Sequence, residues 1–251
     1  MHPILFRIGD FEVHSFGLMM AFAWLAAGAY LDREFRRHVS RVPRALVGDL
    51  IVWALAGSLI GARLLYLAVE YPSWTADAWS AVFSRSGFVF YGGLVGGVAA
   101  GVWLVRRRGL SIRAVGDVVA PALALGLCVG RIGCFLAGDD YGKPSDVPWA
   151  VTFTDPDTLA PPGVPLHPAQ LYLSANALAI FLILNFLLPR RMFKGQVLSL
   201  FLMLYPAGRF LLEFFRGDPR GAWGPFSTSQ WISLLVFPAG IWLYAWLRRT
   251  K

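Results

Sequence analysis

The chain has 251 residues, of which 57% are hydrophobic and only 15% are charged, and its mean hydropathy is +0.56. Soluble domains average about 25% charged residues, so this composition excludes an ordinary soluble protein and indicates an integral membrane protein. The formal net charge is +8, but no basic stripe with interleaved aromatic residues indicates a nucleic-acid partner.

Apolar stretches long enough to cross a bilayer as helices recur along the whole chain. They predict an all-α protein with about seven transmembrane helices and a single transmembrane domain over residues 1–251. The first fourteen residues lack the apolar run and cleavage site of a secretory signal, so the first span is expected to direct insertion. The approximate bounds of the spans are 15–32, 46–70, 87–105, 115–137, 167–188, 195–215 and 229–247.

Basic residues concentrate after every second predicted span. Because Lys and Arg near helix ends tend to stay cytoplasmic, this asymmetry predicts an external N-terminus and a cytoplasmic C-terminus. Outside the spans, residues 71–86 carry Trp74, Trp79 and Phe83 among small polar residues and suit a segment at the membrane interface. Residues 138–166 contain too many prolines for a helix and predict a small periplasmic loop or head.

Three arginines, Arg63, Arg131 and Arg209, fall inside predicted spans. A charged side chain at the centre of a bilayer costs at least about 2.5 to 3.5 kcal/mol unless it is compensated. At about 1.5 Å per residue, the three lie roughly 26, 24 and 21 Å from the cytoplasmic ends of their helices. They therefore share one layer in the outer half of the membrane, and their planar donor forks match phosphate oxygens. We expect a phospholipid headgroup to bind there.

The sixth span adds a polar stripe to this layer. Tyr205, Arg209 and Glu213 follow one another at intervals of four and Arg216 comes three residues later, so all four are expected on one helical face. Glu213 can pair with one arginine but cannot neutralise both. The arginines are thus expected to outnumber their acidic neighbours, which favours an anionic ligand. The acids counted are Glu70, Asp139 and Glu213.

The third span begins with two stripes of small residues, which are typical of closely packed helices in lipid. Tyr91 precedes them, and its hydroxyl is expected in the layer of the arginines; an interfacial tyrosine is the alternative. The stripes are Gly92, Gly96, Ala100 and Gly93, Gly97, Gly101.

Histidine and cysteine offer few further candidates. His14 and His167 lie at the predicted outer surface, where either could act as a base or serve a structural role at a helix start. Cys128 and Cys134 point about 240° apart on one helix, which excludes a disulfide or a metal pair between them. No cofactor or metal site is predicted.

With these residues in place, the chain resembles the prolipoprotein diacylglyceryl transferases, bacterial inner-membrane enzymes. The likeness runs nearly from end to end. Its segments are HSFGLM, GARLLY, FVFYGGLVGG, GRIGCFLAGDDYGKP, HPAQLY, YPAGRFLLEFFRGD and FSTSQWISL.

The resemblance implies that phosphatidylglycerol donates its diacylglyceryl group to the lipobox cysteine of a prolipoprotein signal peptide, on the periplasmic side of the membrane. A thioether forms and glycerol phosphate leaves. Arg131 and Arg209 would hold the lipid phosphate with support from Tyr205 and Glu213, and Tyr91 would join the catalytic group. The remaining expected phosphatidylglycerol-binding residues are Arg63, Asp139, His14, His167 and Gln170.

Several positions depart from the family pattern. Tyr91 stands where many members have a histidine, so either Tyr91 orients the substrate while another group or solvent takes the thiol proton, or the chain is a divergent member with weak or altered activity. The substitutions at positions 91 and 134 also leave open a lipid-binding paralog without catalysis. A membrane transporter is a further alternative, but the inner halves of the spans hold few polar residues. The other departures are Phe16 for tyrosine, Cys134 and Ala137 for asparagine, and Asp139 and Leu173 for glutamate.

Overall fold

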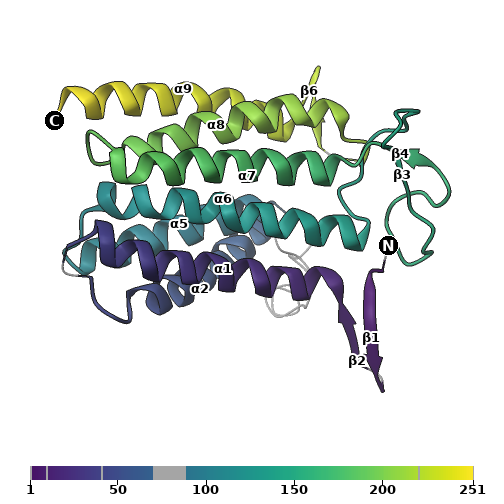
Figure 1. The fold of residues 1–251 in the computed structure, drawn as a ribbon, viewed down its shortest axis with the longest axis horizontal. Helices are drawn as coiled ribbons and strands as arrows, with labels where there is room; N and C mark the ends of the chain where they lie inside the picture. Colours follow the sequence, from purple (N-terminus) through teal and green to yellow (C-terminus); the bar gives the residue numbers. More distant parts are fainter. Residues whose placement is uncertain (1, 10, 41, 70–88, 220, 251) are drawn as a thin grey trace. The chain divides into compact units, whose positions relative to one another are not determined.

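A computed structural model describes the chain except for residues 1, 10, 41, 70–88, 220 and 251 (Figure 1). The predicted interfacial segment 71–86 and Glu70 therefore lie outside the described residues. The chain divides into two compact units, Met1–Glu34 with Gly116–Lys251, and Phe35–Val115.

Six helices in the described part are long and apolar enough to cross a membrane. The remaining predicted span, the third (87–105), also forms a helix, α5 (Phe90–Arg107), which is rich in glycine and ends in two arginines. The protein is thus an all-α membrane protein, as predicted, while the sides that its ends face stay a prediction. The six are α1 (Ser15–His38), α2 (Leu46–Val69), α6 (Ile112–Ala137), α7 (Ala169–Leu187) with the 3-10 turn η1 (Leu188–Arg190), α8 (Gln196–Leu212) with η2 (Glu213–Phe215), and α9 (Thr228–Arg249).

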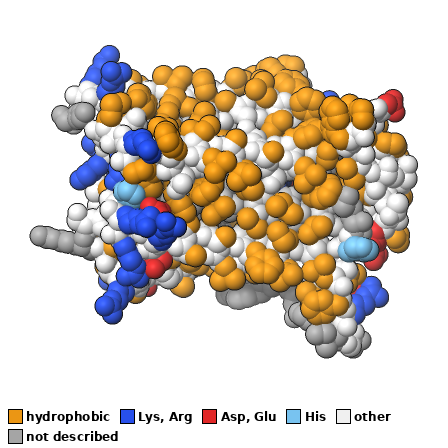
Figure 2. Space-filling view, viewed as in Figure 1, with side chains coloured by type: hydrophobic (Ala, Val, Ile, Leu, Met, Phe, Trp, Pro, Cys, Tyr) orange, Lys and Arg blue, Asp and Glu red, His pale blue; other side chains and the backbone are white. Residues whose placement is uncertain are grey.

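Hydrophobic side chains cover the middle of the helices on the face drawn in Figure 2, whereas Lys and Arg side chains gather toward helix ends. Leu182 and Phe186 on α7 and Leu235 on α9 are among the exposed large apolar residues. Such a surface is unfavourable in water and is matched by lipid chains.

In the first unit, α6, α7, α8 and α9 lie side by side (Figure 1). The start of α8 is fixed by α6. Gly195, the N-cap residue of α8, has no side chain to accept a hydrogen bond, and the fully buried Asp117 of α6 accepts instead from the amides of Gly195 (2.7 Å) and Leu198 (3.0 Å). Asp117 thus satisfies two of the amides that every helix start leaves unpaired.

In the second unit, α2 and α5 pack through facing glycines. A methyl group added at Gly92 or Gly96 would collide with the carbonyl oxygen of Gly61 or Gly57, whereas one added at Gly101 would meet nothing within 4 Å. The packing interpretation of the small residues is therefore confirmed for Gly92 and Gly96 of one stripe and for Gly97 of the other, where an added methyl group would collide with Ser58 Oγ.

The described residues also form three short antiparallel strand pairs: β1 (Ile4–Ile8) with β2 (Phe11–His14), β3 (Val151–Thr152) with β4 (Pro165–Leu166), and β5 (Ala222–Trp223) with β6 (Phe226–Ser227). Between α6 and α7 the chain forms no helix, as its prolines predict. Phe153, Ala160 and Leu166 form a small buried cluster there.

Candidate functional site

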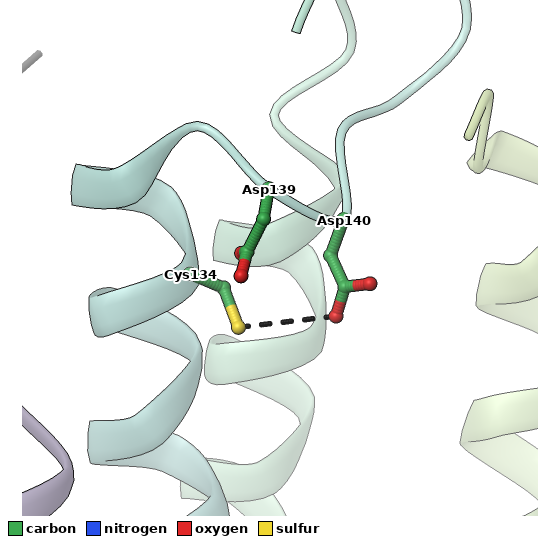
Figure 3. A group of neighbouring side chains, drawn as sticks. All are labelled: Cys134, Asp139 and Asp140. Carbon is green, nitrogen blue, oxygen red and sulfur yellow. Dashed lines mark hydrogen bonds between the residues drawn. The ribbon is translucent and has the colours of Figure 1, made fainter. Parts of the chain in front are cut away.

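Arg131 lies near the end of α6, where the chain turns back on the helix. Arg131 Nη1 donates to Asp140 Oδ2, and Cys134 Sγ lies 3.8 Å from both atoms. Figure 3 shows the Cys134 thiol beside the Asp140 carboxylate. Gly138 (φ 74°) ends the helix in a left-handed conformation, and Asp140 (φ 55°) is the one non-glycine residue with positive φ in the described part of the chain. These two left-handed residues return the Asp140 carboxylate to the arginine.

The same carboxylate contacts a second arginine. Arg216 Nη2 pairs with Asp140 Oδ1, while Arg216 Nε donates to Asp218 Oδ1 at 3.0 Å. The expectation that Arg216 continues the face of α8 is wrong. The helix ends at Leu212, tightens into η2 and leaves Arg216 extended (φ −80°, ψ 141°).

Arg209 is buried on α8 and pairs with Glu213, four residues later, as the spacing predicts. Its Nη2 also donates to Ser229 Oγ at 3.2 Å. Glu213 Oε1 accepts from Ser227 Oγ at 2.8 Å, and Ser227 caps α9 in a capping box with Gln230. Neither serine was predicted as a site residue, although the spacing of Ser227 and Gln230 is a recognisable capping signal.

The charges of Arg131 and Arg216 both act on Arg209, and Tyr205 is an electrostatic neighbour of Arg131 and Arg209. The structure thus brings together four predicted site residues: Arg131, Tyr205, Arg209 and Glu213. The N–H donors of Arg131 are only partly used, because within the described residues its polar contacts involve Nη1 alone. A guanidinium has five N–H donors, so Arg131 Nε and Nη2 can still meet an anion.

The predicted excess of arginines over acids is wrong for this cluster. Asp140 and Asp218, which the sequence count omitted, supply carboxylates to Arg131 and Arg216, and Glu213 supplies one to Arg209. The case for an anionic ligand therefore depends on the clustering of the arginines and their remaining donors.

Asp139, Gln170 and His167 lie around the same loop. The fully buried Gln170 donates from Nε2 to the Asp139 carbonyl oxygen at 2.7 Å. Burial raises the pKa of the Asp139 carboxyl above its ordinary value. His167 Nδ1 lies 3.2 Å from the hydroxyl of Tyr172, which also accepts from Trp149 Nε1 at 2.6 Å. These contacts favour a structural role for His167.

The remaining predicted site residues are His14, Arg63 and Tyr91. His14 is exposed at the end of β2, with Nε2 3.8 Å from Glu12 Oε2. In the second unit, the Arg63 guanidinium lies over the Tyr66 ring, 5.2 Å from its centroid, and Tyr91 at the start of α5 is half-buried. That Arg63 and Tyr91 share a site with Arg131 stays a prediction.

Cys134, Asp139 and Asp140 present one potential metal ligand each, with the ligand atoms within 4.8 Å of one another (Figure 3). Arg131 contacts two members of this group. Its guanidinium already places a positive charge there, which opposes a cation and favours an arginine-carboxylate network.

The fold and this cluster define an integral membrane protein with partly buried arginines suited to an anionic group. A family model described as prolipoprotein diacylglyceryl transferase matches residues 3–246. The chain belongs to this family.

Three relatives are named phosphatidylglycerol--prolipoprotein diacylglyceryl transferases. The chain is 35% identical over 247 residues to the one from Clostridium tetani, with 97% of each chain covered. It is 34% identical to transferase 2 of Clostridium perfringens, covering 97% of this chain and 94% of the relative. It is 33% identical to that of Geobacter sulfurreducens, covering 99% and 96%.

Proposed function

We propose that this chain transfers the diacylglyceryl group of phosphatidylglycerol to the lipobox cysteine of prolipoproteins. Membership of the family over nearly the whole chain is the observation that carries this proposal. In the reaction, the cysteine thiol loses its proton and its sulfur forms a C–S bond to the diacylglyceryl carbon. The bond from that carbon to the phosphate oxygen breaks, and glycerol phosphate leaves with the electron pair.

Arg131 and Arg209 are the proposed phosphate-binding pair. Negative charge develops on the leaving phosphate, and fixed donors aimed at developing charge lower a reaction barrier. Tyr205 lies electrostatically close to both arginines, and Glu213 and Ser229 hold Arg209. The positive charge also favours the thiolate form of an incoming cysteine.

The proposed roles of the other residues are less direct. Gln170 and His167 hold the loop that carries Asp139, since both contact it or its neighbours through hydrogen bonds. Tyr91, Arg63 and His14 are proposed to approach the substrate from outside this cluster. The tyrosine hydroxyl at position 91 would orient the substrate, because a neutral phenol is a weak base.

The site is proposed to face the periplasm, with the protein in the bacterial inner membrane. The asymmetry of Lys and Arg supports this orientation. In this proposed orientation, the arginine cluster lies on the side of the membrane opposite to the segments that are rich in Lys and Arg.

A transporter is less well supported. Transport needs a polar route through the membrane, but the inner polar residues of the first unit serve helix packing. Asp117 caps α8, and Asn185 Oδ1 accepts from the hydroxyl of Tyr30 at 3.0 Å. Uptake of an anion into liposomes that contain the protein would revive this alternative.

The decisive assay supplies purified protein with labelled phosphatidylglycerol and a lipobox peptide and measures the thioether product. We expect Arg131→Ala and Arg209→Ala each to abolish turnover. The matched control is Arg7→Ala, since Arg7 is an exposed arginine of β1 that pairs with Glu12. No product from the folded wild-type protein would refute the proposed function, and lipid binding without product would indicate a non-catalytic paralog.

A further inference from the structure

The Asp140 carboxylate lies between two arginines, with Oδ2 on Arg131 and Oδ1 on Arg216. We propose that Asp140 is a positioning residue that ties Arg131 to Arg216 and so orients the Arg131 fork toward the lipid phosphate. This proposal rests on the proposed function, in which Arg131 binds that phosphate.

Arg216 is the fixed end of this connection. Its side chain is only 2% exposed and also pairs with Asp218. The backbone around it is bonded to the loop after Asp140: the amide of Gly217 donates to the Tyr141 carbonyl at 3.0 Å, and the amide of Lys143 donates to the Phe215 carbonyl at 2.9 Å. Asp140 and Arg216 are therefore held together by main chain as well as by charge.

Arg131 is the end that needs orienting. Its side chain is 20% exposed, and within the described residues its carboxylate contact is made by one nitrogen. A long arginine side chain has many rotamers, and an ion pair at one nitrogen selects among them while leaving the others for a ligand.

The backbone of Asp140 indicates that its placement matters. A φ of 55° is unfavourable for most residues, and Asp and Asn tolerate it better than others. Asp140→Asn therefore removes the negative charge with little change in shape or backbone preference. Asp140→Gly removes the side chain and relaxes the backbone. Comparing the two variants distinguishes the effect of the carboxylate from the effect of the backbone conformation at position 140.

We expect both variants to lower kcat/KM for phosphatidylglycerol at least about tenfold, because misplaced binding groups cost large factors in rate. The KM for the lipobox peptide should stay within about twofold of wild type, since the tie acts on the phosphate-binding arginine. In an Arg131→Lys background, Asp140→Asn should change kcat/KM by at most about twofold, because lysine has no planar fork to orient.

The matched control is Asp146→Asn, an exposed carboxylate in the same connection, which should behave as wild type. If Arg131→Ala is inactive while Asp140→Asn and Asp140→Gly retain wild-type kinetics, the positioning role is wrong and the proposed function stands. A KM for the lipobox peptide that rises well beyond twofold, or the same Asp140→Asn effect on kcat/KM in the Arg131→Lys background, would also overturn it. An inactive wild-type protein would instead refute the proposed function.

Discussion

Replacing Asp117 by alanine should destabilise the protein far more than replacing an acidic residue near the surface. Asp117 is fully buried and accepts from two amides at the start of α8, and its Oδ2 also lies 3.5 Å from Arg191 Nε. Hydrogen bonds to a charged group contribute about 1.5–3 kcal/mol each, and removing one partner of a buried ion pair costs about 3–5 kcal/mol. Since these losses overlap, we expect Asp117→Ala to lower the free energy of unfolding by about 3–5 kcal/mol.

The assay is denaturant unfolding in detergent micelles, followed by tryptophan fluorescence. The control is Asp49→Ala: Asp49 pairs with Arg108, and the two side chains are 30% and 37% exposed. Such an exposed pair contributes about 0–1 kcal/mol. Asp117→Asn keeps one acceptor oxygen, so its loss in free energy of unfolding should lie between those of Asp117→Ala and Asp49→Ala. Equal losses for Asp117→Ala and Asp49→Ala would refute the assignment of Asp117 as the cap of α8.

Three further outcomes are expected. Gly92→Ala should lower the free energy of unfolding by about 1–3 kcal/mol through overpacking, whereas Gly101→Ala should not, as measured in the same micelles. Tyr91→Phe should reduce turnover at least about tenfold, equivalent to about 1.4 kcal/mol of barrier, and unchanged turnover would remove its hydroxyl from the reaction. Burial raises the pKa of Asp139 in the fold, so its contribution to stability is present below the unfolded pKa of about 3.9 and is lost as the pH rises through the folded pKa. The melting temperature of Asp139→Asn should therefore rise relative to that of the wild type as the pH rises. A difference between the two melting temperatures that stays constant with pH would contradict this reasoning.

The helices could be predicted because each one needs a long apolar stretch, and such a stretch is visible in the sequence. The ion pair between Arg209 and Glu213 could also be predicted, since both residues lie on a regular helix with a spacing of four. These features depend on local periodicity.

The contacts of Arg131 and Arg216 could not be predicted in this way. The tie through Asp140 depends on two left-handed residues after α6 and on a backbone turn after α8. Neither the positive φ of an aspartate nor the end of a helix one turn early follows from the hydrophobic pattern. From the sequence, Asp139 and Asp140 just past α6 could equally be solvated loop residues or hold an arginine, and only the fold shows that Asp140 contacts Arg131 and Arg216.

The bonds between the Tyr141–Lys143 and Phe215–Gly217 segments have a consequence for biosynthesis. The two segments leave the ribosome at different times, with α7 and α8 between them. A nascent chain that has inserted α6 carries Arg131 into the bilayer before Arg216 has been translated. The pairing of Arg131 and Arg216 through Asp140 must therefore wait until α8 and the segment after it have been made.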